Sequence, residues 1–222
     1  MSETNNIDAI MKLARVIPVL VIKEAAYARP IAEALVAGGL RALEVTLRTP
    51  VALDAIREMA KVEGAVVGAG TVLNERDLEA SLEAGAQFIV SPGLTKPLGK
   101  AAIASGIPFL PGIATAADIM RGLDMGLSRF KFFPAMAAGG IPALKALAAP
   151  FHQCRFCPTG GISQPTFRDW LALDEVPCVG GSWLVPPGRP DAVAITTTAR
   201  AIAGPSVSGP VAGLSLAGTG RI

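Results

Sequence analysis

The sequence predicts an α/β protein folded as a closed (β/α)8 barrel, the TIM barrel, with an extra helix before the first strand. Three observations predict this fold class. Short apolar runs rich in β-branched residues alternate with Ala- and Leu-rich helical patterns along the chain. There are eight such runs, and they begin roughly 19–26 residues apart, as consecutive βα units do. Gly and Pro gather after the third to eighth runs, where the loops of a barrel carry its chemistry.

The elements follow in order from the N-terminus. Residues 5–14 have a helical pattern, VIPVLVI (16–22) is the first expected strand, and a helix follows it through Ala37. ALEVTL (42–47) is the second strand, with a helix near 51–61 behind it. The other expected strands, each followed by a helical stretch, are AVVGAG (65–70), FIVSPG (88–93), IPFLPGI (107–113), RFKFFPA (129–135), RFCPTGG (155–161) and VPCVGGSW (176–183).

An open, doubly wound sheet is the alternative fold. Such a sheet is expected to carry a glycine-rich phosphate loop after its first strand. The stretch at that place, VIKEAAY, has no glycine. The barrel is therefore the favoured prediction.

The chain has 222 residues, a length that suits one large domain. We expect a single barrel domain over residues 1–203. Residues 204–222, GPSVSGPVAGLSLAGTGRI, are rich in Gly, Ser and Pro and carry one charge, Arg221. This composition predicts a flexible extension, or a strap across the surface, rather than a second domain.

Composition limits the partners of the chain. Hydrophobic residues make up 51% and charged residues 17%, which predicts extensive buried surface and suits a subunit interface. A net charge of +2 without a Lys/Arg cluster gives no case for nucleic acid. No apolar stretch reaches the roughly 18 residues of a membrane helix. The N-terminus, MSETNNIDAIMKLAR, lacks the pattern of a signal peptide, so we expect no membrane partner and a cytoplasmic location.

The three cysteines do not form a disulfide framework. Cys154 and Cys157 make a C-x-x-C with His152 just upstream, and Cys178 stands alone. A zinc or redox site would usually need a second such motif or further ligands. Buried structural thiols are therefore the favoured interpretation.

A lysine stands in the middle of an aromatic strand. In RFKFFPA, alternation puts Lys131 and Phe133 on one face and Phe130 and Phe132 on the other. If the two phenylalanines pack against the outer helices, Lys131 points into the barrel. Burial there disfavours the ammonium, and the freed lone pair can form a Schiff base with a carbonyl. The alternative is a lysine stem on apolar surface, with its charge paired or hydrated.

The second strand has an unusually polar face. In LEVTLR, Glu44, Thr46 and Arg48 share one face, whereas a barrel strand usually fills its inner face with apolar residues. Glu44 can move protons at substrate atoms, and Arg48 can hold a carboxylate with its two-pronged guanidinium. A structural Glu44–Arg48 pair inside the barrel is the alternative.

Glycines follow the last two strands. Gly160 and Gly161 come after the seventh, and Gly180, Gly181 and Ser182 end the eighth. In barrels the loops at these places often bind phosphate through backbone N–H groups. Two ordinary βα turns are the alternative.

Two other loop residues complete the set. Thr71 follows GAG and can donate a hydrogen bond, while Pro92 in SPG is expected to shape a wall rather than to react. Together, an amine, a carboxylate, a guanidinium and a phosphate cradle suit a substrate with a carbonyl, a carboxylate and a phosphate. An amine that condenses with a ketone makes an electron sink, so a carbon–carbon bond two atoms away can break without a metal.

Other chemistries fit the sequence poorly. His152 is the single histidine, which argues against a Ser-His-Asp triad, a histidine-based metal site and a metal-dependent phosphosugar epimerase. No G-x-G-x-x-G follows a strand, so no dinucleotide cofactor is expected. We expect neither a metal nor a cofactor.

LEVTLRTP, GAGTVLN, SPGLT, LPGIAT, FKFFPA, RFCPTGGIS and GGSWLVP together resemble the bacterial 2-keto-3-deoxy-6-phosphogluconate (KDPG) aldolases. The resemblance covers about residues 10–200, with the motifs in the order of the family. It implies a class I aldolase of the Entner–Doudoroff pathway that forms pyruvate and glyceraldehyde 3-phosphate and often handles 4-hydroxy-2-oxoglutarate. It also implies a (β/α)8 homotrimer whose partner is a small phosphorylated keto acid.

The resemblance implies a role for each matched residue. Lys131 forms the Schiff base, Glu44 is the general acid/base, and Arg48 and Thr71 hold the pyruvyl carboxylate. It implies that Pro92 and Phe133 line the pocket and that Thr159 lies near the substrate hydroxyls. The residues implied to bind the phosphate are Gly160, Gly161, Gly181 and Ser182.

The chain departs from the family pattern where FPA is followed by Met136 rather than Glu. A lost carboxylate there alters the field at the site, unless the position is plain surface. Two hypotheses stay open beside the main one. A 6-phosphogalactonate aldolase would share Lys131 and Glu44 but recognise the hydroxyls differently, and a barrel without catalysis would serve as a self-assembling protein.

Overall fold

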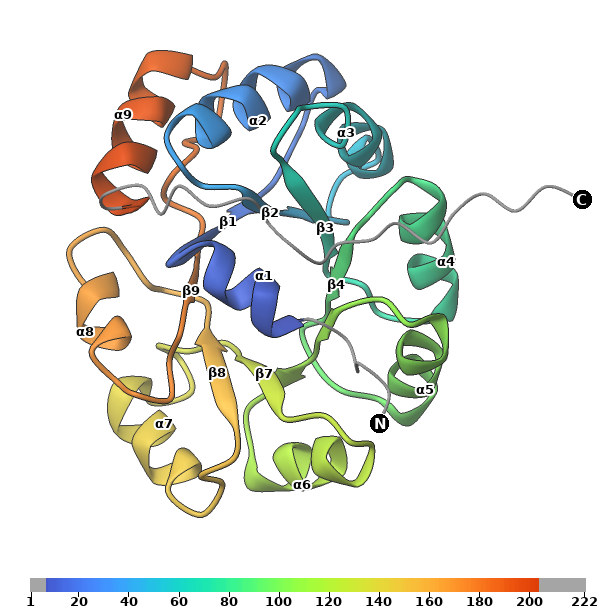
Figure 1. Ribbon diagram of the computed structural model, residues 1–222, viewed down its shortest axis with the longest axis vertical. Helices are drawn as coiled ribbons and strands as arrows, with labels where there is room; N and C mark the ends of the chain where they lie inside the picture. The colour runs from blue at the N-terminus through green and yellow to red at the C-terminus, as the bar shows by residue number, and fades with distance from the viewer. Residues whose placement is uncertain (1–6, 204–222) are drawn as a thin grey trace, which may run out of the picture.

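The computed structural model describes residues 7–203, and its strands run through the middle of a ring of helices (Figure 1). Every strand pairing in the described residues is parallel. The strands are β1 (Val16–Leu20), β2 (Ala42–Thr46), β3 (Val66–Gly70), β4 (Phe88–Val90), β5 (Phe109–Leu110), β6 (Gly112–Ile113), β7 (Arg129–Phe132), β8 (Arg155–Pro158) and β9 (Val179–Gly181).

A helix lies between almost every pair of successive strands, as parallel pairing requires. The helices are α1 (Ile7–Leu13), α2 (Ala28–Ala37), α3 (Ala52–Met59), α4 (Glu75–Glu83), α5 (Lys96–Ser105), α6 (Ala116–Asp124), α7 (Gly140–Ala148), α8 (Phe167–Leu171) and α9 (Ala192–Ala203), and a short 3-10 helix, η1 (Ala25–Tyr27), precedes α2. No helix of residues 7–203 is long and apolar enough to cross a membrane.

The strands form two ladders that curl around a common centre (Figure 1). One ladder has the order β5-β4-β3-β2-β1-β9 and the other β6-β7-β8. The sequence predicted one strand over 107–113, but the structure divides it into β5 and β6 at Pro111. Proline has no N–H to donate to a ladder, so the break falls there. The observed fold is an α/β fold with a curled parallel sheet.

The two phenylalanines of β7 face the outer helices, as alternation predicted. Phe130 and Phe132 are both fully buried. The ring of Phe132 lies 6.4 Å from that of Trp170 on α8, and the ring of Phe130 lies 6.3 Å from that of Phe156 on β8. Fully burying such a side chain stabilises a fold by about 1.5–3 kcal/mol. This packing fixes β7 so that Lys131 faces the opposite way.

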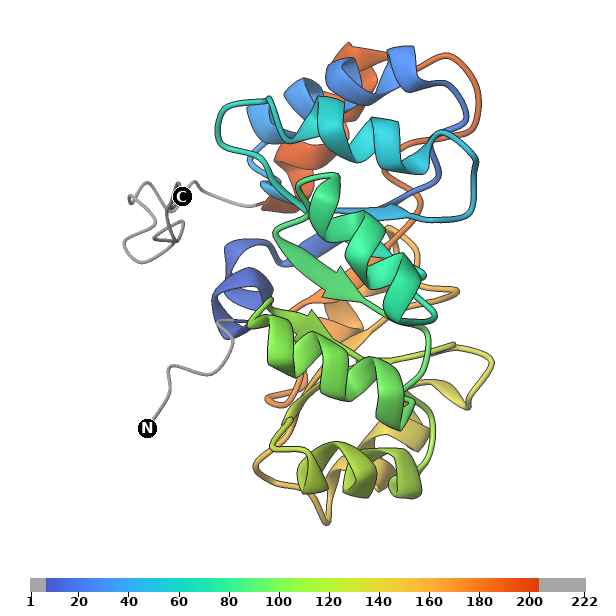
Figure 2. The ribbon, with the colours of Figure 1, turned by 90° about the vertical axis from the view of Figure 1, so that its right-hand side faces the viewer.

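Helix α1 lies across the end of the sheet where the strands begin. Asp8 on α1 accepts a 2.5 Å hydrogen bond from Nε of Arg129, the first residue of β7. Ile10 and Met11 of the same helix are buried. Figure 2 shows α1, in dark blue, on the side from which the strand arrows start. The carboxyl ends of the strands are therefore the open end.

The predicted elements differ from the observed ones mainly at their boundaries. The helix expected over 5–14 is α1, of which the structure describes Ile7–Leu13. Most expected strands were a few residues too long, because they included loop residues after the carboxyl ends. The stretch expected to be an extension, residues 204–222, lies outside the described residues.

Candidate active site

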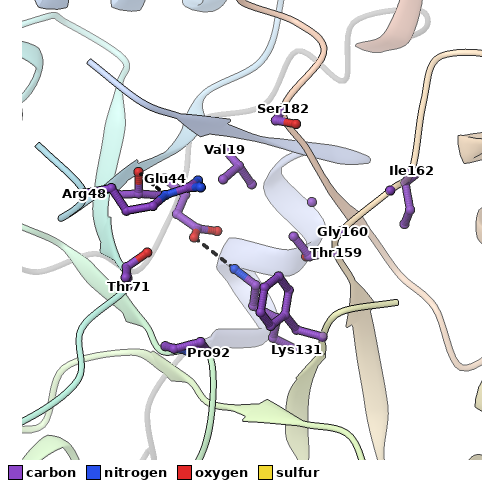
Figure 3. Close-up of a pocket in the computed structure, with 14 residues that line it drawn as sticks. Val19, Glu44, Arg48, Thr71, Pro92, Lys131, Thr159, Gly160, Ile162 and Ser182 are labelled. Atoms are coloured by element: carbon purple, nitrogen blue, oxygen red, sulfur yellow. Dashed lines mark hydrogen bonds and ion pairs between the residues drawn. The ribbon is translucent and has the colours of Figure 1, made fainter. Parts of the chain in front are cut away.

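A cavity of about 360 Å³ opens at the carboxyl ends of the strands (Figure 3). Its walls come from residues at or just after the ends of most strands. The lining residues are Val19, Glu44, Thr46, Arg48, Thr71, Pro92, Lys131, Phe133, Thr159, Gly160, Gly161, Ile162, Gly180 and Ser182. All of the site residues predicted from the sequence except Gly181 are among them.

Lys131 and Glu44 form a buried pair inside the cavity. Nζ of Lys131 donates a 3.0 Å hydrogen bond to Oε1 of Glu44, and their side chains are 7% and 4% exposed. Figure 3 draws this contact as a dashed line across the cavity. The sequence left open a structural Glu44–Arg48 pair, but the ion-pair partner of Glu44 is Lys131. A buried ion pair is weak evidence for stability, so a buried amine beside a carboxylate inside a cavity points to chemistry.

Gly70 at the end of β3 makes room for the Glu44 carboxylate. A Cβ at Gly70 would overlap the carboxyl group of Glu44. Gly70 is the parallel partner of Thr46, two residues along β2 from Glu44. Two residues earlier on β3, opposite Glu44, a Cβ at Gly68 would overlap the ring of Phe88, which is fully buried. The floor under the pair is therefore apolar and close-packed.

Arg48 is held at the cavity by a short chain of hydrogen bonds. Its Nε donates to Oγ1 of Thr46 at 3.1 Å, and that hydroxyl donates to the Leu20 carbonyl of β1 at 2.8 Å. Thr46 is buried, so the anchor is fixed to two strands. Within residues 7–203 the two terminal nitrogens of the guanidinium have no hydrogen-bond partner, so they remain for a ligand.

The charges that line the cavity sum to a positive value. Counted by formal charge, Lys131 and Arg48 contribute two positive charges and Glu44 one negative charge, a sum that a proton passing from Lys131 to Glu44 does not change. Among the described residues, no acidic side chain makes an ion pair with Arg48. A site with a spare guanidinium favours an anionic ligand, since the fork of arginine matches a carboxylate or a phosphate.

The loop after β8 presents two glycines in left-handed backbone conformations. Gly160 has φ +104° and Gly161 has φ +78°. A residue with a side chain would be strained in this backbone conformation. The Thr159 and Gly160 carbonyls accept hydrogen bonds from the amides of Ala135 and Met136, at 2.8 and 3.0 Å. The loop is thereby tied to the segment that follows Lys131.

Met136, the departure from the family pattern, stands at the rim. Its side chain lies against Gly161, where a Cβ would come within 2.8 Å of the Met136 stem. The residue is 51% exposed and is not among those that line the cavity. The position is thus an exposed one behind the glycine loop.

The strand end at β9 contributes Gly180 and Ser182 rather than Gly181. Because side chains alternate along a strand, Gly180 and Ser182 face the cavity and Gly181 faces away. A Cβ at Gly181 would overlap the ring of Trp183. Thr159 is the bridge partner of Gly180, and a Cβ at Gly180 would overlap the Thr159 side chain.

Three further residues complete the wall. Thr71 has φ +61°, a conformation that costs energy in a residue other than glycine and that recurs at ligand sites. The ring of Phe133 has its centroid 5.4 Å from Nζ of Lys131. Figure 3 places Pro92 on the same side of the cavity as Thr71.

None of the three cysteines lines the cavity, although one of them neighbours Lys131. Cys157 is the parallel partner of Lys131 on β8. A hydrogen bond with Cys157 and burial both raise the pKa of Cys178 well above that of an ordinary thiol, so it stays neutral. All three cysteines are buried and free, as structural thiols are expected to be. Within residues 7–203, no group of three or more His, Cys, Asp or Glu is arranged to hold a metal ion.

Some lining residues were not singled out as site residues from the sequence. The sequence placed Thr46 on the polar face of β2. Its hydroxyl anchors Arg48 because it also donates a hydrogen bond to Leu20 on another strand, a contact that the sequence does not indicate. Val19 and Ile162 are ordinary apolar residues, and only the curvature of the sheet brings them to the cavity. No sequence signal marks them.

Comparisons with known proteins agree with this geometry. The family model for KDPG and KHG aldolase matches residues 7–198. A 2-dehydro-3-deoxy-phosphogluconate aldolase of Zymomonas mobilis is 60% identical over 195 residues, which cover 88% of this chain and 94% of that protein.

Two solved structures are also similar. The Zymomonas mobilis ZM4 KDPG aldolase with 3-phosphoglycerate has a TM-score of 0.89 and 58% identity, covering 90% of this chain and 96% of that one. The Legionella pneumophila KDPG aldolase, with pyruvate captured as a covalent carbinolamine, has a TM-score of 0.86 and 46% identity, covering 89% and 98%. The chain described here belongs to the KDPG and KHG aldolase family.

Proposed function

We propose that this enzyme cleaves KDPG to pyruvate and glyceraldehyde 3-phosphate, the aldolase step of the Entner–Doudoroff pathway, with Lys131 as the Schiff-base lysine. As a member of its family the protein is a lyase, a class I aldolase. The observation that carries the assignment of residues is the buried contact of 3.0 Å between Nζ of Lys131 and Oε1 of Glu44. An amine next to a carboxylate has a proton acceptor and donor at hand for each step of imine formation.

The reaction begins at the keto carbon of the substrate. The neutral amine of Lys131 attacks this carbon, and Glu44 supplies the proton that lets the carbinolamine lose water as an iminium. Removal of the proton from the C4 hydroxyl then breaks the C3–C4 bond. The electron pair of that bond moves into an enamine, and glyceraldehyde 3-phosphate leaves. Protonation of the enamine at C3 and hydrolysis of the resulting imine release pyruvate and restore Lys131.

The other lining residues bind and orient the substrate. Arg48, fixed by Thr46, holds the pyruvyl carboxylate, and the Thr71 hydroxyl assists it. The spare positive charge of the cavity supports this role, because KDPG is an anion at both ends. Thr159 lies near the substrate hydroxyls, and Pro92 and Phe133 confine the reacting carbons.

The phosphate binds at the other end of the cavity. Gly160 and Gly161 let the backbone approach an anion closely, and Ser182 adds a hydroxyl. Gly181 takes part through its backbone only, because it faces Trp183. A substrate without phosphate, 4-hydroxy-2-oxoglutarate, is the second substrate that we propose, since the family model joins both activities.

We also propose how the whole chain is organised. The Thr159–Gly180 bridge links β8 to β9, and only Pro111 separates β5 from β6, which supports one closed (β/α)8 barrel with α1 as an extra helix. Residues 1–203 then form one domain, with 204–222 as an extension. Because its phosphorylated substrate does not cross membranes unaided, the cytoplasm is the proposed location.

A homotrimer is the proposed assembly. Its support is the family resemblance and the apolar side chains that remain exposed in the single chain, such as Leu73 at 56% and Met120 at 57%. Light scattering should give three times the chain mass of 22.7 kDa. A monomer mass would refute the trimer.

Borohydride trapping with pyruvate tests the proposed function. Reduction of the imine should leave a pyruvyl adduct, and peptide mass mapping should place that adduct on Lys131. The matched control is Lys131→Met, which keeps an unbranched stem but has no amine. An adduct on another lysine, or none on folded protein, would remove Lys131 as the nucleophile. Cleavage of KDPG against its galactonate epimer decides the substrate, and preference for the epimer would overturn that choice.

A further inference from the structure

A second cavity, which we call the annex, adjoins the catalytic cavity, and the mechanism proposed above places no substrate atom in it. Its volume is about 520 Å³. Val19, Arg48 and Ser182 line both cavities, whereas Lys131 and Glu44 line the catalytic one alone. Figure 3 shows the three shared residues along one side of the catalytic cavity. The annex lies on their other side, between the segment after β1 and the segment after β9.

Most of the annex wall is apolar. Val21, which is 43% exposed, and Ile22 follow β1, and Ile31 comes from α2. Val185 and Pro186 come from the segment after β9. Rigid apolar walls of this kind bury a ring or a branched hydrocarbon, and the volume is typical of a small-molecule site. A sugar phosphate has no apolar body to place there.

The charged groups of the annex favour an anion. Lys23, Glu24 and Arg48 line it, together with the Tyr27 hydroxyl. Burial, a hydrogen bond with Glu24 and the charge of Glu24 raise the pKa of Tyr27, while Arg189 lowers it. The neutral Tyr27 hydroxyl therefore already donates a hydrogen bond to the Glu24 carboxylate. Lys23 and Arg48 make no ion pair within the described residues, so the net charge around the annex is positive.

Arg48 is the one strong anion-binding group that both cavities reach. Its Nε is taken by Thr46, and the terminal nitrogens are the donors that remain. A carboxylate bound from the annex and the pyruvyl carboxylate of the substrate would need the same donors. With Nε on Thr46, the terminal nitrogens leave one unobstructed two-pronged face, so two carboxylates that each bind Arg48 in this way exclude one another.

We propose that the annex binds an aromatic carboxylate, with its ring between Val21, Ile31 and Val185 and its carboxylate on Arg48, and that such a ligand inhibits the enzyme by competing with substrate. The competition rests on the proposed function, in which Arg48 holds the substrate carboxylate. The binding itself rests only on the annex.

Naphthalene-2-carboxylate is the probe, and the full chain is used throughout. Calorimetric titration should show binding, and inhibition of KDPG cleavage should be competitive. Val21→Asp places a negative charge in the annex and should weaken the affinity for the probe by about tenfold or more, which corresponds to about 1.4 kcal/mol. Neither kcat nor KM for KDPG should change in this variant, because Val21 does not line the catalytic cavity.

Val193→Asp is the matched control. Val193 is 76% exposed on α9 and lines neither cavity, so the same substitution there should leave the affinity for the probe unchanged. Naphthalene-2-carboxamide, which has no charge, should bind at least about tenfold more weakly than the carboxylate. Absence of binding, equal affinity in the two aspartate variants, or non-competitive inhibition would each overturn the proposal.

The titration also separates this proposal from the proposed function. Binding of the probe does not require catalysis, so it should persist in Lys131→Met. If pyruvate fails to trap Lys131 while Val21→Asp still weakens probe binding, the function fails and the annex stands. If pyruvate traps Lys131 but the probe does not bind, the annex fails and the function stands.

Discussion

Nζ of Lys131 lies 3.0 Å from Oε1 of Glu44, although 87 positions separate the two residues in the sequence. They come from β7 and β2, which belong to different ladders. The contact exists because the sheet curls and both side chains face its centre, above the Phe88 ring. A carboxylate at this distance can take up and return the protons that leave the amine, so the pair predicts distinct effects for its two members.

Replacing Lys131 by Ala should remove essentially all KDPG cleavage. No other strand in the described residues contains a lysine, so no second amine can take over the covalent step. The measurement is the steady-state rate, with circular dichroism to check folding. Lys145→Ala, at an exposed position of α7, should keep the wild-type rate. Substantial turnover in the Lys131→Ala protein would mean that another nucleophile acts.

Glu44→Gln should slow cleavage while leaving Lys131 able to form an imine. Glutamine keeps the shape of Glu44 but cannot shuttle protons, and general acid–base catalysis typically contributes ~10²–10⁴-fold. Borohydride trapping over time should therefore still label Lys131, but more slowly than in the wild-type enzyme. An unchanged rate of cleavage would remove Glu44 from the mechanism.

Gly70→Ala should impair the enzyme although Gly70 carries no reactive group. The added methyl group would overlap the Glu44 carboxylate, which must then move away from Nζ of Lys131. A displacement of about 1 Å at a reacting group can cost about 10²-fold in rate. We expect a fall in kcat of that order.

Gly93→Ala is the control for this substitution. An added Cβ at Gly93 would meet nothing within 4 Å, and the backbone there is not left-handed. This variant should retain the wild-type kcat. Equal rates for the Gly70 and Gly93 variants would show that the position of the Glu44 carboxylate is not critical.

The inward position of Lys131 could be predicted from the sequence because its neighbours allow only one arrangement. Four aromatic or apolar side chains surround it, and Phe130 and Phe132 need the buried space under the helices. The polar face of β2 is a similar local signal, since Glu44, Thr46 and Arg48 recur every second residue. Both predictions depend on alternation, which a strand cannot escape.

Features that depend on two distant segments could not be predicted in the same way. The break at Pro111 reflects how β5 and β6 pair with different neighbours. The choice of Glu44 rather than solvent as the partner of Lys131 depends on sheet curvature. Gly181 shows the limit of motif reasoning, because the GGS sequence marks the loop but only the strand register tells which glycine faces the cavity.

Asp118→Asn should lower the stability of the fold without changing kcat or KM, and the loss should depend on pH. Thr115 and Asp118 form the capping box at the start of α6, and Asp118 also pairs with Arg121 at 2.9 Å. Burial raises the pKa of Asp118, but hydrogen bonds from Thr115, Ala114 and Arg121 outweigh it and hold the pKa below its ordinary value. A carboxyl group whose pKa is lower in the folded state stabilises the fold above its unfolded pKa. That contribution is lost as the pH falls through the folded pKa.

Urea unfolding should therefore show the Asp118→Asn variant about 1 kcal/mol less stable than the wild type at neutral pH, with the difference shrinking toward pH ~3. Asp54→Asn, which breaks an exposed pair with Arg57 on α3, should cost less than about 0.5 kcal/mol. A difference for Asp118→Asn that stays constant with pH would show that the charge of Asp118 is not what stabilises the start of α6.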